Sequence, residues 1–216
     1  AAAWFHLPET HVNRGEAGHG FSLLSGARRL FAMARFRGYT LTLAFTSCVF
    51  FSFLGGAPHI MVDVLKRTPM EYGLWFFCVS AGYMLGNFIS GRFTQRLGID
   101  RMMMAGNIVT LAGGLMCLAA ALGGWLSPAT LFVPMAFAAL GNGLTIPNAT
   151  AGAISVDPRL TGAAAGWAGF TQMAFGAAAS QLVGSLQDGW PFAVFWFMAS
   201  ASILALLTHT LAIRRK

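Results

Sequence analysis

The stretch GNGLTIPNATAGA, residues 141–153, places polar side chains and a proline inside an apolar run that is long enough to cross a bilayer. Its polar members are Asn142, Thr145, Asn148 and Thr150. Pro147 removes a backbone hydrogen-bond donor, so it usually bends or breaks a helix. At membrane depth such features are tolerated where they face protein or a water-filled cavity. The stretch therefore predicts either a wall of a substrate path or a kinked helix whose polar side chains bond to neighbouring helices.

The composition places this stretch in a membrane protein. Of the 216 residues, 56% are hydrophobic and 10% are charged, whereas a soluble domain carries roughly 25% charged residues. Between Gly38 and Ile213, every Asp, Glu, Lys and Arg falls in a short connection between apolar runs. We therefore expect an all-α polytopic membrane protein that is surrounded by the lipid bilayer.

The placement of charged and reactive residues disfavours other classes of protein. The net charge is +7, but the basic residues cluster beside alternate ends of the apolar runs, which argues against nucleic-acid binding. The three cysteines lie within apolar runs without the CxxC spacing of a metal site, and we interpret them as packing residues. The five histidines are scattered and no HExxH or GxSxG occurs, so we expect no enzyme activity, cofactor or metal.

Six apolar runs predict six transmembrane helices, over residues 39–61, 72–90, 102–126, 129–155, 161–187 and 190–213. Residues 1–7 are apolar but too short to span, so we expect them to end a truncated preceding helix and the chain to be a fragment. Residues 8–37 are expected to form a cytoplasmic loop. Within it, residues 21–36 have the spacing of a basic amphipathic helix, which we expect to lie against the inner leaflet.

Loop charge predicts the orientation of these helices. One side of the membrane would hold twelve of the fourteen Lys and Arg residues, and the other side only Lys66 and Arg67. Because cytoplasmic loops carry the excess of positive charge, both ends of this chain are expected in the cytoplasm. The first helices of the two successive triplets then run in opposite directions, as in the 3+3 inverted repeats of transporters.

Small residues spaced by four predict close helix packing in several runs. Gly82 and Gly86 form such a stripe in the second run, and Gly162 and Gly166 form one in the fifth. These stripes serve either packing within the bundle or contact with another bundle.

Larger and polar side chains stand beside the stripes. Tyr83 and Asn87 are four apart on an adjoining face, where they can point into a cavity or bond helix to helix. Trp167 and Gln172 supply large and polar groups in the fifth run. In the first run, an aromatic cluster precedes GGAPH at residues 55–59, which predicts a hinge or kink.

Several segments resemble a known family, and together they cover most of the chain. LPET at residues 7–10, GGAPHI at 55–60 and IPNATAGA at 146–153 are similar to segments of the sixth, seventh and tenth helices of major facilitator superfamily transporters. EYGLWF…GYMLGNFISGRF, residues 71–93, is similar to the eighth helix. The chain thus resembles the C-terminal half, the last six of twelve helices, and more narrowly the Bcr/CflA-type bacterial drug-resistance exporters.

The connection GRFTQRLGIDR, residues 91–101, is similar to the superfamily's loop motif, G-x-x-x-D-R-x-G-R-R. Gly91, Arg96 and Gly98 match this motif, whereas Gln95 stands where the motif usually has Asp. The resemblance therefore does not extend to a charge relay in this loop.

The resemblance implies a multi-pass carrier of the bacterial inner (plasma) membrane that exports small amphipathic, antibiotic-like molecules in exchange for protons. It also implies that the partner is a missing N-terminal six-helix half, which would hold the proton-carrying carboxylate. No carboxylate occurs at the middle of any apolar run of this chain.

In that architecture, the first and fourth helices of each half line the cavity, and the second and fifth lie between the halves. The implied substrate-binding residues are Phe50, Phe53, Pro58, Asn142, Thr145 and Asn148. The implied helix-packing or gating residues are Gly82, Gly86, Tyr83, Asn87, Gly91, Arg96, Gly98, Pro147, Gly162, Gly166, Trp167 and Gln172.

Two alternatives remain open at this point. A carrier of the same superfamily can move a metabolite such as a sugar, although the absence of Arg and Lys within the runs argues against organic acids. A self-sufficient six-helix protein can also dimerise through the glycine stripes, although the truncated first helix favours a fragment.

Overall fold

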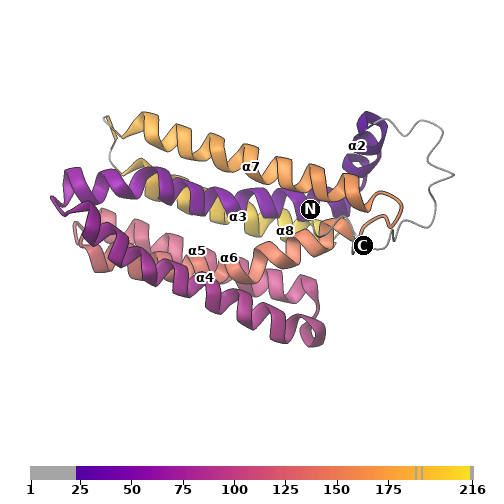
Figure 1. Cartoon of the computed structure of the whole chain (residues 1–216), viewed down its shortest axis with the longest axis horizontal. Coiled ribbons are helices and arrows are strands. Elements are labelled where there is room, and N and C mark those ends of the chain that lie inside the picture. Colours follow the sequence, from indigo (N-terminus) through magenta and orange to yellow (C-terminus); the bar gives the residue numbers. More distant parts are fainter. Residues whose placement is uncertain (1–22, 188, 191, 215–216) are drawn as a thin grey trace, which may run out of the picture.

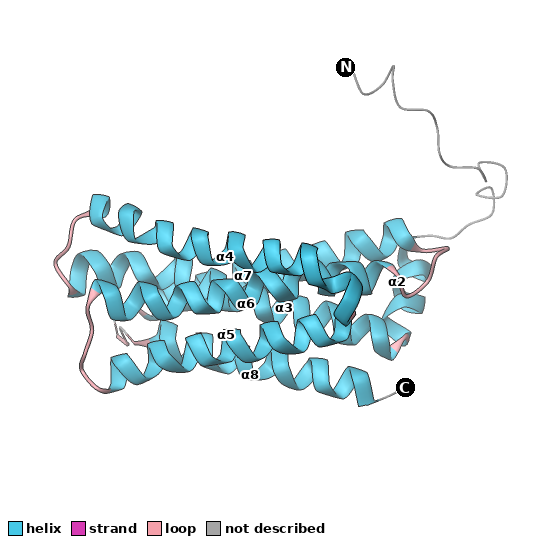
Figure 2. Cartoon of the chain, turned by 90° about the horizontal axis from the view of Figure 1, so that it is seen from below, coloured by secondary structure: helices cyan, strands magenta, loops and turns pink. Residues whose placement is uncertain are grey.

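The computed structural model describes residues 23–187, 189–190 and 192–214. The described residues are almost entirely helical and contain no strand, and short loops lie at the two ends of a long bundle (Figure 2). The helices are α2 (Leu23–Ala32), α3 (Ala34–His59), η1 (Ile60–Val64), α4 (Pro69–Leu97), α5 (Ile99–Leu122), α6 (Pro128–Ile154), α7 (Thr161–Leu186) and α8 (Ala193–Arg214). The predicted end of a preceding helix, residues 1–7, lies outside the described residues.

Five of the six long helices are long and apolar enough to cross a membrane. They are α3 with η1, α4, α5, α6 and the part of α8 from Ala193 to Leu211. The helix α7 has similar length and carries no charged residue, but its many Gly, Ala and polar residues make it less apolar. The all-α membrane architecture is therefore confirmed, whereas the count of six spans stays a prediction.

Several helices extend beyond the apolar runs that predicted them. The helix α4 continues through Arg92 and Arg96 to Leu97, so these charges lie on its last turns rather than in a loop. Gly98 then adopts φ +84°, a conformation that favours glycine, and α5 begins at the next residue. One residue is therefore enough to turn the chain between these two helices.

Two proline-containing caps define the starts of α4 and α6. The Thr68 hydroxyl accepts a hydrogen bond from the Glu71 backbone N–H at 3.2 Å, with Pro69 at the first helical position. Ser127 and Thr130 form a reciprocal capping box immediately around Pro128. The sequence thus encodes both helix starts locally.

The long helices form two layers. In Figure 1, α3, α7 and α8 lie together in the upper part of the view and α4, α5 and α6 in the lower part. The helix α3 packs mainly on α7 and α8, and α6 packs mainly on α4 and α5, while α3–α6 and α5–α8 contacts join the layers. The first helix of each triplet therefore packs on the second and third helices of the other, which is the pairing of an inverted repeat.

Glycines set the distance between α4, α5 and α6. A Cβ atom on Gly82 or Gly86 of α4 would overlap the backbone carbonyls of Ala136 or Leu140 in α6. On the other side of α6, a Cβ atom on Gly141 would overlap the backbone of α5. These helices approach so closely because no side chain separates their backbones at these points.

The prolines inside α6 and at the end of α3 differ in their effect on the helix. The structure has no break at Pro147, because α6 runs as one helix from Pro128 to Ile154 with Pro134 and Pro147 inside it. Beside Pro147, the Asn148 amide donates to the Leu144 carbonyl of its own helix at 2.7 Å. At Pro58 the helix does change, and η1 follows with a π-type bond of 2.8 Å from the Leu65 N–H to the Ile60 carbonyl.

The helix α2 forms within the predicted amphipathic stretch. Its Leu30 side chain is fully buried in a cluster with Leu160 and Ala164. The helix therefore packs its apolar face on the start of α7. The placement of the helix against the inner leaflet stays a prediction.

Candidate functional site

A cavity of about 330 Å³ lies between α3, α4, α6 and α7. Its walls are formed by Ser47, Phe50, Phe51, Phe76, Val79, Ser80, Tyr83, Met84, Asn142, Ile146 and Gln172. The volume falls at the lower end of the range for small-molecule sites, about 300–1,000 Å³. None of the lining residues is acidic or basic, so the walls present a neutral surface to a ligand.

Aromatic rings form one side of the cavity. Phe50 lies edge-to-face with Phe51, with ring centroids 5.9 Å apart, and tilted against Phe76 at 6.4 Å. These rings bring together one turn of α3 and one turn of α4. Flat apolar surfaces of this kind bind bulky ligands through dispersion and burial rather than through a fixed set of hydrogen bonds.

The polar groups of the cavity differ in whether they already have partners. Gln172 of α7 donates from Nε2 to the Ser47 hydroxyl of α3 at 2.9 Å. Asn142 of α6 accepts a hydrogen bond at Oδ1 from the Thr110 hydroxyl at 3.2 Å. Its Nδ2 has no hydrogen-bond partner, although the residue is only 1% exposed. Because a buried unpaired donor is costly, this amide is the group in the cavity that gains most from a ligand acceptor.

The sequence matches the model of the Major Facilitator Superfamily over residues 4–216. The chain belongs to the major facilitator superfamily. The fold and the resemblance predicted from the sequence are thereby confirmed, and members of this family are transporters rather than enzymes.

Curated relatives of this facilitator chain include drug-resistance proteins. It is 30% identical over 93 residues to the chloramphenicol resistance protein CraA of Acinetobacter baumannii, which covers 43% of this chain and 22% of the relative. It is 20% identical over 213 residues to a bicyclomycin resistance protein homolog of Haemophilus influenzae, covering 97% of this chain and 52% of the relative. An uncharacterised transporter of Rickettsia bellii is 24% identical over 223 residues, and 54% of it is covered. The chain thus spans about half the length of the relatives that it matches throughout.

The residues predicted to bind substrate separate into two groups in this facilitator fold. Phe50 and Asn142 line the cavity. Phe53 is fully buried and packs edge-to-face on Phe132 at 5.5 Å, within the core rather than at the cavity wall. Pro58 is exposed at the end of α3 and is absent from the cavity lining.

The other two predicted binding residues, Thr145 and Asn148, are buried and already hydrogen-bonded. Asn148 donates from Nδ2 to the Ser90 hydroxyl of α4 at 2.7 Å. The Thr145 hydroxyl donates to Asn107 Oδ1 of α5 at 3.4 Å, and Thr46 of α3 donates to the same oxygen at 3.4 Å. These side chains tie α6 to α4 and α5, so their contacts favour a packing role.

The predicted packing or gating residues of α4 have distinct environments. Gly82 and Gly86 face the α6 backbone, as described above, while Tyr83 lines the cavity that holds Asn142. Asn87 donates from Nδ2 to the Tyr83 carbonyl of its own helix at 2.9 Å. Gly91 is exposed, with open space where a Cβ atom would stand.

The loop-motif residues Arg96 and Gly98 line an open depression between the end of α4 and the start of α5. Asp100 in this depression accepts a hydrogen bond from the Tyr39 hydroxyl at 2.8 Å. Its carboxylate is thus bonded to α3, and no described residue forms an ion pair with Arg96.

The predicted residues of α7 lie on two faces of that helix. Gln172 reaches the cavity, whereas Trp167 lines a separate apolar groove together with Gly162, Gly166 and Phe170. Both glycines have open space where a Cβ atom would stand. The resemblance implied that the second and fifth spans, which are α4 and α7, lie between the two halves of the carrier. In the structure, α4 and α7 also contribute residues to the walls of the cavity.

Sequence reasoning missed seven lining residues, namely Ser47, Phe51, Phe76, Val79, Ser80, Met84 and Ile146. A signal for some of them exists, since Ser47 and Phe51, and likewise Phe76 and Ser80, are four apart and share a helix face. A helix has several such faces, however. Which face lines a cavity depends on how the neighbouring helices pack.

Proposed function

We propose that this chain forms one half of a carrier that exports small amphipathic, drug-like molecules across the bacterial inner membrane by alternating access, with both ends of the chain in the cytoplasm. The observation that carries the proposal is the neutral, aromatic-walled cavity with the unpaired Asn142 amide. The names of the drug-resistance relatives support the same class of substrate.

The chemistry of the cavity favours ligands of varied shape and little charge. Phe50, Phe51 and Phe76 offer apolar surface, and Asn142 offers one hydrogen-bond donor. A ligand that carries an aromatic or aliphatic body and one carbonyl or hydroxyl oxygen satisfies both features. Few fixed polar contacts also mean weak discrimination among such ligands, which suits export of several compounds.

Coupling to protons is assigned in this proposal to the missing six-helix half. Within the described part of the chain, the acidic residues lie at helix ends or in connections, as with Asp63, Glu71, Asp100 and Asp157. None of them lines the cavity. The proposal therefore expects the carboxylate that exchanges protons in the other half of the carrier.

The proposal is tested by efflux from cells that express the intact parent gene, using a panel of antibiotics and a cationic dye, with and without a protonophore. We expect several unrelated compounds to be exported and the protonophore to abolish their export. Absence of efflux for all of them, with the protein present in the membrane, would contradict the proposal.

The Asn142 amide is tested in the same assay by Asn142→Ala in the intact carrier. Loss of one neutral hydrogen bond of about 0.5–1.5 kcal/mol should raise the half-saturating substrate concentration about two- to tenfold. Asn87→Ala is the matched control, because the Asn87 amide bonds only to its own helix and is absent from the cavity lining. Equal effects of the two variants would remove the assigned role of Asn142.

Transport of a neutral metabolite such as a sugar is the second candidate function. The polar residues of the cavity support transport of a sugar, because their neutral side chains can form hydrogen bonds with sugar hydroxyls. These residues are Asn142, Gln172, Ser47 and Ser80. Saturable sugar uptake that competes with no drug, in cells that show no drug efflux, would decide for this candidate.

A further inference from the structure

The helix α2 crosses one end of the bundle, where α3 and α7 begin, at a steep angle to the long helices (Figure 1). Leu30 is fully buried in the cluster that includes Leu160 and Ala164. Phe31 packs edge-to-face on Trp167 of α7, with ring centroids 5.8 Å apart. Leu30 and Phe31 thus join α2 to the bundle.

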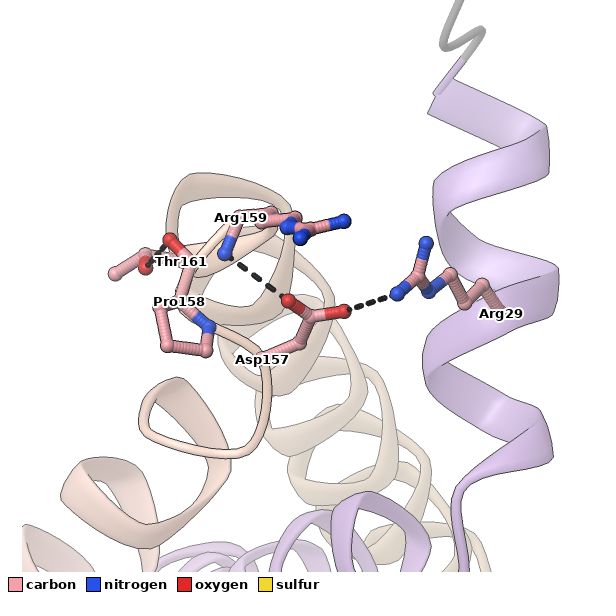
Figure 3. Close-up of polar contacts among 5 residues, drawn as sticks. All are labelled: Arg29, Asp157, Pro158, Arg159 and Thr161. Carbon is pink, nitrogen blue, oxygen red and sulfur yellow. Dashed lines mark hydrogen bonds and ion pairs between the residues drawn. The ribbon is translucent and has the colours of Figure 1, made fainter.

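One carboxylate connects α2 to the turn between α6 and α7 (Figure 3). Asp157 Oδ2 lies 3.0 Å from the Arg29 guanidinium, and Oδ1 accepts a hydrogen bond from the Arg159 backbone N–H at 3.0 Å. The contact with Arg29 is an ion pair without the alignment of a hydrogen bond, so it depends on charge. The Asp157 side chain is only 9% exposed. Among the described residues it is the one buried carboxylate, and Arg29 is its one cationic partner.

The C-terminal end of α2 is held by α3. Arg37 donates from Nη1 to the carbonyls of Phe31 and Ala32, at 2.6 and 3.1 Å. These are among the last carbonyls of α2, which have no partner within the helix. The chain is extended at Met33 between the two helices. Helix α2 is therefore fixed at its middle by Asp157 and at its end by Arg37.

We propose that α2 is a strap that positions the α6–α7 turn and Trp167 during transport, and that Arg29 and Asp157 are the positioning residues through which it acts. The helices α6 and α7 make few direct contacts with each other, because α6 packs mainly on α4 and α5 and α7 packs mainly on α3. They supply Asn142 and Gln172 to the cavity wall. The strap therefore helps to set their spacing at this end.

Aromatic contacts connect α2 to the open groove of α7 through Trp167. Trp167 lies between Phe31 of the strap and Phe170, with which it also packs edge-to-face at 5.8 Å. The same Trp167 lines the groove formed with Gly162 and Gly166. Release of α2 removes one of the two rings that hold the Trp167 indole, so the shape of the groove changes.

The inference rests on the proposed transport function, and its test separates the two. In the intact carrier we would compare Arg29→Ala, Asp157→Asn and the exchanged pair Arg29→Asp with Asp157→Arg. Arg28→Ala is the matched control, because Arg28 is the adjacent exposed arginine of α2 and contacts no described acidic residue. Each variant is purified and its melting temperature is measured, so that a variant that fails to fold is recognised. If the variants of the buried Asp157 fail to fold, Arg29→Ala decides the test, because Arg29 is half-exposed.

The first readout is transport. We expect Arg29→Ala to lower the maximal rate about five- to tenfold through the conformational step, with the half-saturating concentration unchanged, because neither residue lines the cavity. The exchanged pair should recover most of the rate. A rate for Arg29→Ala equal to that of Arg28→Ala, or no recovery in a folded exchanged pair, would overturn the proposal.

The second readout does not depend on transport. Spin labels at Arg28→Cys and Thr161→Cys, both exposed positions, in a background with Cys48, Cys78 and Cys117 replaced, report the distance from α2 to the start of α7. We expect a narrow distance distribution in the parent and a broad one in Arg29→Ala. Equally narrow distributions would overturn the strap even if transport falls. Failure of the parent to transport any compound would instead count against the proposed function, while the distances still decide the strap.

Discussion

Helices α4 and α7 carry the same small-residue spacing, yet the two stripes have opposite environments. Gly82 and Gly86 of α4 are packed against backbone carbonyls of α6, where even a Cβ atom would overlap. Gly162 and Gly166 of α7 have no atom within 4 Å of the place where a Cβ atom would stand, and they line an open apolar groove. A stripe of glycines therefore permits close approach without specifying which partner approaches.

The comparison shows where this bundle is complete by itself. The contacts of α4 with α6 are satisfied within the chain, so substitution there should act on folding. The groove of α7 is open within the described residues, so substitution there should act on whatever the proposed other half contributes. The next three predictions use this difference, from the largest expected effect to the smallest.

Gly86→Leu should have the largest effect. A Cβ atom at this position already overlaps the Leu140 carbonyl, and a backbone atom cannot move aside as a flexible side chain can. We expect destabilisation of at least about 3 kcal/mol, seen as loss of folded protein or a sharply lowered melting temperature of the detergent-purified carrier. A melting temperature within error of the parent would mean that α4 and α6 are not packed as described.

Asn148→Ala should have an intermediate effect on stability. It removes the bond from Nδ2 to the Ser90 hydroxyl, which joins α6 to α4 beside their glycine contact. Side-chain hydrogen bonds between membrane helices contribute about 1 kcal/mol, so the melting temperature should fall moderately while the half-saturating substrate concentration stays constant. The opposite pattern, with normal stability and altered substrate affinity, would place Asn148 in the substrate site.

Gly166→Ala should have the smallest effect on stability. The added methyl group meets open space, so we expect a change of less than about 0.5 kcal/mol in unfolding free energy. Gly166→Leu in the intact carrier is the informative extension, because a large side chain should obstruct any helix that docks in the groove. Normal melting with reduced transport is expected, and normal transport for the leucine variant would show that no helix uses this groove closely.

Much of the fold could be predicted because its determinants are local. Apolar runs bounded by charges identified the helices, and the bounds differ mainly where helices continue past the apolar core, as at Arg92 and Arg96. The capping residues Thr68 and Ser127 and the left-handed Gly98 are likewise written in short segments of sequence. The helix of residues 161–186 was also located, although it is less apolar than the others.

The candidate site was predicted less completely, because helical spacing gives a face but not its neighbour. Phe50 and Phe53 are three residues apart, yet Phe50 lines the cavity and Phe53 packs on Phe132 in the core. Asn142 and Asn148 both lie in the stretch that first indicated a substrate path. One has an unpaired amide beside the cavity, and the other donates two hydrogen bonds.

The amphipathic stretch before α3 shows the same limit for a whole element. Its spacing correctly indicates an apolar face, but lipid and protein offer similar apolar surroundings to Leu30. The position of α2 on α7 involves contacts with residues far away in the sequence, including the Leu30 cluster with Leu160 and the ion pair of Arg29 with the buried Asp157. Only the fold brings this acid and base together.

By itself the sequence determined the membrane environment, the helices, the small-residue stripes and the family, because each depends on composition or on residues that are near in the chain. Tertiary structure alone decided which glycine stripe is filled, which polar side chains are already bonded and which walls enclose the cavity. The physical reason is that a helix presents several faces of similar chemistry in an apolar medium. Contacts between residues that are distant in sequence then determine which face is buried against protein and which remains open.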